Sequence, residues 1–296
     1  MNKILVGIAI SVILLTGAHY IYLSRKAPSE IYPDDTWLAS AVPKKAVIIV
    51  ANDDDAISAA GTISLLCQAG WNIKELCFYN SVNSREETDR ILQRQEDTRK
   101  VREIQGLSEF SYVSIPYRHT DTTDPFPDRP LPSDAFSQQY NRDTLLYHIR
   151  RFIEENQPVV VFSLDNNIGG YGHPDPVMVS RLVVEECVRR AKDPSFPVQC
   201  IYQAVFTPSM AGRILGDLPA YKTAVASYGM GMPLPDVQVN IESAGAKKKA
   251  ILEAYSTEQN SLRRLWPFYN YYPARVYFNL FNREFFKTIR LKEGTD

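Results

Sequence analysis

The stretch that decides the fold is Ala46-Val47-Ile48-Ile49-Val50-Ala51, followed at once by Asn52-Asp53-Asp54-Asp55. The first six residues form an unbroken apolar run rich in β-branched side chains, which is typical of a parallel strand buried on both faces. Residues 56–69 then carry apolar side chains at helical spacing, and Gly70 ends that pattern. A buried strand, a short acidic loop and a helix make the first unit of an α/β protein.

The same alternation continues along the chain. Further strands are predicted at residues 73–79, 110–115, 158–164 and 199–206, with helices at 85–105, 143–155 and 175–191. Between the third strand and the next helix, residues 117–140 are expected to form a long loop. This order predicts an α/β fold with one Rossmann-like, doubly wound, mostly parallel sheet. Ligands of such sheets bind beyond the carboxyl ends of the strands, where the acidic loop and a glycine-rich loop at residues 169–172 both lie.

The N-terminus differs from the rest of the chain. Residues 4–15 are apolar, aromatic residues extend the run, and basic residues flank it on both sides. We expect residues 1–26 to be a single signal anchor that holds the protein at a membrane, or else a signal peptide whose cleavage exports it. Residues 27–42, with proline, small and acidic residues, are expected to be a linker. Residues 43–296 would then form a single domain.

Composition narrows the classes of function. The 296 residues are 45% hydrophobic and 23% charged, which indicates a folded globular protein. The formal net charge of -1 offers no general attraction for nucleic acid, and we expect no nucleic-acid partner. The four cysteines are scattered without a CxxC pair, which argues against a cysteine zinc site and favours buried apolar thiols.

Both loops at the carboxyl ends of the strands carry groups able to do chemistry. Asp53, Asp54 and Asp55 repel one another, and either a bound cation or a raised pKa on one of them would relieve that repulsion. A helix cap with two solvated neighbours is the alternative interpretation. In the second loop, Asp175 stands two residues from His173, where a carboxylate can orient an imidazole and hold it protonated to stabilise an oxyanion. A loop histidine and a helix cap are the alternative there.

These residues resemble the motifs of the PIG-L/LmbE-like deacetylases. Residues 50–58, Val-Ala-Asn-Asp-Asp-Asp-Ala-Ile-Ser, resemble the first motif, A-H-P-D-D-E, and residues 172–176, Gly-His-Pro-Asp-Pro, resemble the second, G-H-x-D-H. Weaker similarities lie at residues 94–96 and 249–259. The resemblance implies a Rossmann-like fold and the zinc-dependent removal of an N-acetyl group from an amino-sugar conjugate, such as one of N-acetylglucosamine.

The resemblance also implies a role for each matching residue. Asp54 would be the general base, and Asp55 would be the carboxylate ligand of the metal. His173 would stabilise the tetrahedral oxyanion, with support from Asp175. The expected substrate-binding residues are Arg94 and Gly172.

Two departures from the family pattern concern the metal. Asn52 and Pro176 occupy the positions of the two zinc histidines. Zinc prefers nitrogen or sulfur ligands, so its affinity should fall greatly, although His119 in the long loop is a possible substitute. An oxygen-rich set of Asn52, Asp53 and Asp55 would suit Mg²⁺ or Ca²⁺ instead. The last alternative is no metal at all, in a relative that binds the sugar conjugate without turning it over.

The C-terminal part carries an aromatic run between Trp266 and Phe286. Such a run stacks on sugars, rests on a membrane interface or packs on its own domain. Packing on the domain is the preferred interpretation, since most large aromatic side chains are buried.

Overall fold

The computed structural model describes residues 2–80, 88–119, 129–132 and 135–292. The predicted start of the second helix and much of the predicted long loop lie outside these residues.

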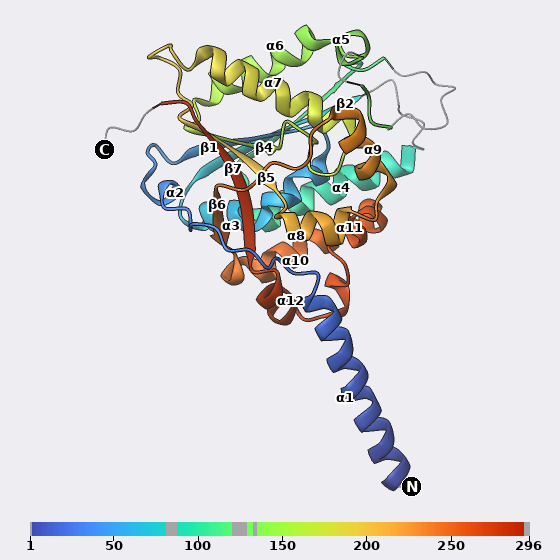
Figure 1. The fold of residues 1–296 in the computed structure, drawn as a ribbon. Coiled ribbons are helices and arrows are strands. Elements are labelled where there is room, and N and C mark those ends of the chain that lie inside the picture. Colours follow the sequence, from blue (N-terminus) through green and yellow to red (C-terminus); the bar gives the residue numbers. More distant parts are fainter. Residues whose placement is uncertain (1, 81–87, 120–128, 133–134, 293–296) are drawn as a thin grey trace.

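Seven strands of the described chain form one sheet in the order β3-β2-β1-β4-β5-β7-β6 (Figure 1). Strands β1 to β5 run parallel to their neighbours, whereas β7 is antiparallel to both β5 and β6. The strand bounds are β1 (Lys45–Val50), β2 (Asn72–Asn80), β3 (Glu109–Ile115), β4 (Val160–Leu164), β5 (Cys200–Val205), β6 (Val237–Asn240) and β7 (Arg283–Arg290).

Helices cover both faces of the sheet. Helices α6 and α7 lie on one face, and α3, α4 and α10 lie on the other (Figure 1). The α-helices are α1 (Asn2–Ser24), α2 (Trp37–Ser40), α3 (Ala60–Gln68), α4 (Thr88–Gln105), α5 (Phe136–Gln139), α6 (Arg142–Asn156), α7 (Pro174–Arg190), α8 (Pro208–Met210), α9 (Pro219–Tyr228), α10 (Gly245–Ala254), α11 (Gln259–Leu265) and α12 (Ala274–Leu280). Short 3₁₀ turns are η1 (Asp53–Ala59), η4 (Glu242–Ala244), η5 (Ser256–Glu258) and η6 (Tyr269–Tyr271), and η3 (Ala211–Leu215) is a π-turn.

The predicted fold class is confirmed, and all five predicted strands are present within two residues of their expected bounds. Strands β6 and β7 are not among those predicted. In β7, Arg283, Glu284, Lys287 and Arg290 interrupt the apolar pattern, although Phe285 and Phe286 between them are buried. Because β7 is antiparallel and near the sheet edge, it needs no continuous apolar run.

Residues 27–42, the expected linker, make specific contacts with the domain. They run along the domain as a strap. The Asp35 carboxylate accepts a hydrogen bond from the Tyr202 hydroxyl at 2.5 Å, and Glu30 accepts one from the main-chain N–H of Ser209 at 2.7 Å. Leu38 is 5% exposed, so the segment also contributes to the core.

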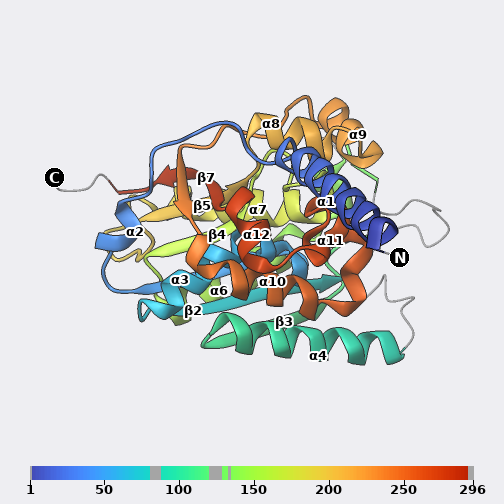
Figure 2. The ribbon, with the colours of Figure 1, turned by 90° about the horizontal axis from the view of Figure 1, so that it is seen from below.

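Of the described helices, only α1 is long and apolar enough to cross a membrane. The span Leu5–Ser24 has a mean hydropathy of 1.8, and none of its most apolar window is buried in the protein. The helix projects from the domain beside α11 and α12 (Figures 1 and 2). The preferred interpretation of the C-terminal aromatic run is confirmed, because Trp266, Tyr269 and Tyr277 are each at most 5% exposed.

The strand order places the switch point of the sheet between β1 and β4. The chain winds from β1 through β2 to β3 on one side, and then continues from β4 to β5 on the other. At such a point the two loops that leave the neighbouring strands part to opposite faces, which leaves a crevice between them. The acidic loop follows β1 and the glycine-rich loop follows β4, so both predicted loops border this crevice.

Candidate functional site

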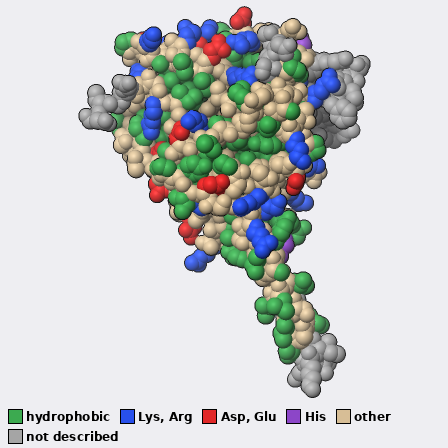
Figure 3. Space-filling view, in the orientation of Figure 1, with side chains coloured by type: hydrophobic (Ala, Val, Ile, Leu, Met, Phe, Trp, Pro, Cys, Tyr) green, Lys and Arg blue, Asp and Glu red, His purple; other side chains and the backbone are tan. Residues whose placement is uncertain are grey.

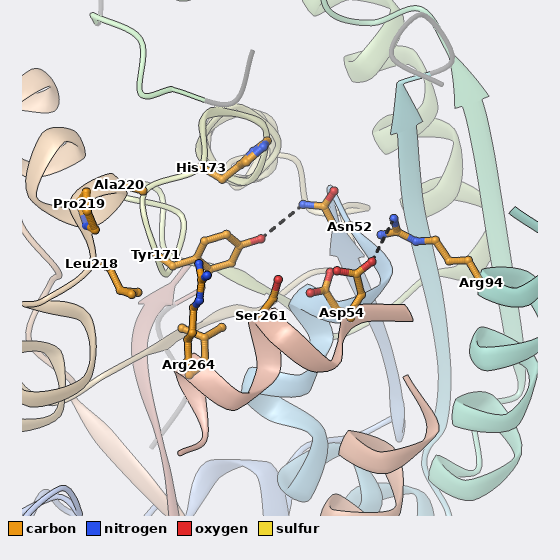
Figure 4. A pocket seen from close by; sticks show the side chains of 12 residues that line it. Asn52, Asp54, Arg94, Tyr171, His173, Leu218, Pro219, Ala220, Ser261 and Arg264 are labelled. Carbon is orange, nitrogen blue, oxygen red and sulfur yellow. Dashed lines mark hydrogen bonds and ion pairs between the residues drawn. The ribbon is translucent and has the colours of Figure 1, made fainter. Parts of the chain in front are cut away.

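A pocket of about 360 Å³ opens at the carboxyl ends of β1 and β4 (Figure 4). Its volume lies in the range of small-molecule sites. The acidic loop and the glycine-rich loop form one side, and α4, the start of α9, η5 and α11 form the rest. The lining residues are Asn52, Asp54, Arg94, Tyr171, His173, Leu218, Pro219, Ala220, Glu258, Ser261, Arg264 and Leu265.

Asp55 is held by neutral donors. Its Oδ1 accepts a hydrogen bond from the Tyr171 hydroxyl at 2.6 Å, and its Oδ2 accepts one from the main-chain N–H of Asn52 at 2.9 Å. The Asn52 side-chain amide lies 3.4 Å from both Oδ2 and the Tyr171 hydroxyl oxygen (Figure 4). Burial raises the pKa of Asp55 to about 6, and the hydrogen bonds from Tyr171 and Asn52 limit this rise.

Asp53 faces away from the pocket floor and is 1% exposed. Its Oδ1 accepts from Arg94 Nη2 at 2.6 Å, and its Oδ2 accepts from the Thr98 hydroxyl at 3.0 Å. This ion pair fastens the acidic loop to α4. The expected role of Asp53 as a metal ligand stays a prediction, and in this structure its carboxylate is paired with the Arg94 guanidinium.

Asp54 is the member of the acidic run that lines the pocket. It keeps partial exposure to the cavity, but protein surrounds the carboxyl on its other sides. Loss of hydration, followed by repulsion from Asp55 and Asp53, raises the pKa of Asp54 well above its ordinary value. The raised pKa favours the protonated form, in which the carboxyl can donate a hydrogen bond to the pocket.

His173 caps the start of α7 and also lines the pocket. Its Nδ1 accepts a hydrogen bond from the main-chain N–H of Asp175 at 3.2 Å, which leaves the ring proton on Nε2. The Asp175 carboxylate lies in a buried cluster, where it accepts from Tyr117 at 3.1 Å, from Arg118 at 3.0 Å and from the Tyr140 hydroxyl. A main-chain N–H contacts the imidazole here, and the expected support of His173 by the Asp175 carboxylate stays a prediction.

Gly172 is placed by sterics beside the pocket. Its φ is +102°, and a Cβ at this position would lie 2.7 Å from the Cβ of Ala224 in α9. Only glycine allows this approach, which brings the glycine-rich loop against α9 and sets the position of His173 next to it. Gly172 itself is not among the lining residues, whereas Arg94, the other predicted substrate contact, is.

The second wall of the pocket comes from α11, which the sequence patterns do not single out. Ser261 and Leu265 are four residues apart and Arg264 is three from Ser261, so one helical face supplies all three. Asp97 of α4, fully buried, anchors the turn before this helix by accepting from the Ser256 hydroxyl at 2.9 Å and from the Thr257 N–H at 3.1 Å. Ser256 lies in residues 249–259, whose weak similarity to the family motifs was the one feature of the sequence that pointed to this wall of the pocket.

The donor set does not fit zinc. Among the described residues, no group of three or more His, Cys, Asp or Glu side chains is placed to hold a metal ion. Asn52 and the Tyr171 hydroxyl donate hydrogen bonds to the carboxylate of Asp55, and His173 is the only imidazole among the described residues that line the pocket. His119, the possible substitute, belongs to no such group. In the oxygen set expected for Mg²⁺ or Ca²⁺, Asp53 is paired with Arg94 in this structure.

The arrangement is suited to holding a polar, uncharged acyl group. The Asp54 carboxyl, in its protonated form, and the Nε2–H of His173 are donors of the kind that a carbonyl oxygen accepts. Tyr171, Leu218 and Leu265 give apolar surface beside them. A few directed donors in a mainly apolar cavity are the usual composition of a small-molecule site.

Sequence comparison adds the family. Residues 47–187 match the family model described as PIG-L, GlcNAc-PI de-N-acetylase. A stretch of 134 residues is 29% identical to 1D-myo-inositol 2-acetamido-2-deoxy-alpha-D-glucopyranoside deacetylase of Thermobifida fusca (strain YX), which is 40% of this chain and 46% of that protein. The chain therefore matches less than half the length of this curated relative.

Solved structures show the same fold at low identity. The deacetylase–teicoplanin complex from teicoplanin biosynthesis has a TM-score of 0.51 and 14% identity, over 84% of this chain and 100% of that one. The 4-carboxy-2-hydroxymuconate hydratase GalB of Pseudomonas putida KT2440 also has a TM-score of 0.51, with 17% identity over 86% of this chain and 100% of that one. Because one fold carries both a deacetylase and a hydratase, the reaction has to be argued from the site.

Proposed function

Residues 47–187 of this chain form a PIG-L family domain, and from that premise we propose that its pocket takes an N-acetylated amino-sugar conjugate as ligand. The observation that carries the proposal is the set of donors at the carboxyl ends of β1 and β4, where Asp54 and His173 line one cavity. The curated relative supports the same class of ligand, since its name describes a 2-acetamido-2-deoxy sugar linked to inositol.

In this proposal the acetamide group lies over the acidic loop. The carbonyl oxygen accepts hydrogen bonds from the Asp54 carboxyl and from His173 Nε2–H. The apolar face of the sugar ring packs on Tyr171, and the linked group extends along the face of α11 toward Arg264. A ligand that lacks the acetyl carbonyl leaves both donors unpaired, which gives the site its selectivity.

We propose recognition of the conjugate without zinc-dependent hydrolysis. The support is the donor set, in which a tyrosine hydroxyl and an asparagine satisfy the carboxylate that the resemblance assigns to the metal. Amide hydrolysis needs an activated water and a polarised carbonyl. Without nitrogen ligands, neither follows from the zinc chemistry that the resemblance implies.

Deacetylation by the protein side chains alone is the second candidate, and one observation favours it. Asp54 lines the pocket and is the residue that the resemblance assigns as general base. As a base it must be ionised, whereas as a donor it must hold its proton. The two roles predict different behaviour for Asp54→Asn, because the amide of asparagine still donates a hydrogen bond but never accepts a proton from water.

We also infer that α1 anchors the domain to a membrane. The span Leu5–Ser24 is about the length that crosses a hydrocarbon core, and none of its most apolar window is buried in the protein.

The test compares binding and turnover in the full chain in detergent. Calorimetry would measure binding of methyl N-acetylglucosaminide, with methyl glucosaminide as the ligand that lacks only the acetyl group. Acetate release and bound metal would be measured on the same sample. We expect the protein to bind the acetylated sugar and not the free amine, to contain no zinc and to release no acetate. We expect Asp54→Asn to retain this binding.

The matched control is Asp143→Asn, the same change at an exposed position in α6. Equal binding of the acetylated and free sugars would refute recognition of the acetamide. Acetate release that Asp54→Asn abolishes and Asp143→Asn preserves would establish the enzyme instead.

A further inference from the structure

The end of α1 is packed against the domain. Leu23 is fully buried. His19 Nδ1 and the Tyr272 hydroxyl are 2.5 Å apart, and the two rings stack with their centroids 5.6 Å apart. The His19 ring also meets Phe268 edge-on at 4.6 Å. The last turns of the helix are therefore part of the folded domain.

A second set of contacts fixes the chain just after α1. Lys26 Nζ donates to the main-chain oxygen of Arg213 at 2.6 Å, and Arg213 Nη1 donates back to the oxygens of Arg25 at 2.8 Å and Ala27 at 3.2 Å. Contacts on two sides of the helix end hold its angle to the domain. The helix cannot swing freely about residues 24–27.

The surface around this junction has a distinct composition. Tyr22 is 48% exposed and Tyr271 is 74% exposed, and Phe268 lies between them with its ring 6.2 Å from Tyr22 and 6.1 Å from Tyr271. Lys26 Nζ lies 5.9 Å from the centroid of the Tyr22 ring, and the neighbouring Arg25 is exposed. Figure 3 shows hydrophobic, basic and histidine side chains gathered where α1 leaves the domain. We call these five residues the collar.

The length of α1 sets the height of the collar. Twenty helical residues rise about 30 Å, which matches the thickness of a bilayer hydrocarbon core. If Leu5–Ser24 crosses that core, its end at Ser24 lies at the membrane–water boundary. Tyrosine, arginine and lysine are enriched at this boundary, and the basic groups attract anionic lipid headgroups.

We propose that the collar is a lipid-contact surface, through which the domain rests directly on the bilayer at a fixed orientation. The proposal rests on the anchoring of α1 and is independent of the sugar ligand. A lipid surface, and not a second protein, is the occupant because the exposed ring of Tyr22 belongs to α1 itself and follows directly on the exposed apolar side chain of Ile21. Arg25 and Lys26 add the charge complementary to an anionic membrane.

The experiment places nitroxide spin labels on the full chain in nanodiscs that contain phosphatidylglycerol. Cys67→Ser removes the one native thiol that is partly exposed. Single labels are then attached at Leu14→Cys in α1, at Tyr271→Cys in the collar and at Tyr147→Cys, an exposed tyrosine of α6 that is 56% exposed and serves as the matched control. Relaxation by oxygen, which enters lipid, is compared with relaxation by a water-soluble nickel chelate.

We expect the label at Leu14 to be protected from nickel and the label at Tyr147 to be fully accessible to it. The label at Tyr271 should show several-fold less nickel access than the label at Tyr147. Nickel access at Tyr271 equal to that at Tyr147, with Leu14 in lipid, would overturn the collar and leave the anchor standing. A water-exposed Leu14 would overturn both. Dipolar broadening between labels at Tyr271 would assign the surface to a second copy of the chain and refute the lipid assignment.

Discussion

Replacing Tyr171 by phenylalanine tests whether a hydroxyl group stabilises the carboxylate of Asp55. The substitution removes one oxygen atom, whose hydrogen bond to Asp55 Oδ1 measures 2.6 Å. Asp55 is 3% exposed, so water cannot readily replace the lost donor. Its other oxygen keeps the main-chain N–H of Asn52.

The size and the sign follow from the ionisation of Asp55. Burial raises its pKa from 3.8 in the unfolded chain to about 6, so folding is favoured below pH 4 and loses stability as the pH rises through 6. The Tyr171 hydroxyl opposes this loss, because it stabilises the ionised form. A hydrogen bond to a charged group contributes about 1.5–3 kcal/mol, so Tyr171→Phe should lower the free energy of unfolding by that amount at pH 8. At pH 4.5, where Asp55 is mostly protonated, the loss should be much smaller.

Thermal unfolding of the full chain in detergent measures the difference between the two pH values. A loss of 1.5–3 kcal/mol corresponds to a melting temperature lower by ~3–12 °C at pH 8. The matched control is Tyr255→Phe, which removes a buried hydroxyl that donates to the uncharged main-chain oxygen of Asp53 at 2.6 Å. Its effect should be the same at both pH values. A Tyr171→Phe effect that does not change between pH 4.5 and pH 8 would refute this account of Asp55.

Three other outcomes are expected. The double change Asn52→His and Pro176→His restores histidine at the two positions where the family motifs carry zinc ligands. Zinc at 100 times its dissociation constant should then raise the free energy of unfolding by about 2.7 kcal/mol, whereas zinc should not stabilise the native sequence. Asp97→Ala removes the buried acceptor that holds η5 to α4, and it should cost about 1–3 kcal/mol in unfolding and weaken sugar binding in calorimetry, because α11 loses its position. Glu30 has its pKa lowered to about 2 by its hydrogen bonds to Ser209, which outweigh burial, so Glu30→Gln should lower the melting temperature at pH 7 and have progressively less effect as the pH falls from 4.5 toward 2.

The parallel strands in the centre of the sheet could be predicted because their local sequences are continuously apolar. A strand such as β1, buried on both faces, must be apolar at every position, and this makes Ala46 to Val50 visible without any knowledge of the neighbours. Strand β7 carries no such signal, since Glu284 within it is buried only because Lys248 and two main-chain N–H groups neutralise it. The main-chain donors belong to Gly61 and Thr62, which are more than 200 residues away from Glu284 in the chain, so no local pattern contains these contacts.

The same distinction applies to the site. The acidic and glycine-rich loops could be located because strand ends fix where loops lie. The direction of each carboxylate could not be predicted. Asp53 points toward Arg94 of α4, whereas Asp54 lines the cavity, and the position of α4 relative to the loop is not visible in the local sequence. No feature of the sequence indicated that the Tyr171 hydroxyl donates a hydrogen bond to Asp55, because Tyr171 stood out only as a residue between glycines.

The pocket is lined by two stretches of the chain, of which one is matched by the PIG-L family model and the other is not. The acidic and glycine-rich loops fall within residues 47–187, the segment that the PIG-L model matches, whereas Leu218, Ser261 and Arg264 lie beyond it. In the proposed binding mode, the first stretch presents the groups that meet the acetamide, and the second borders the group attached to the sugar. Substitutions in the second stretch can therefore change which conjugate is accepted while the first stays constant, so a new ligand can be acquired without rebuilding the acidic loop.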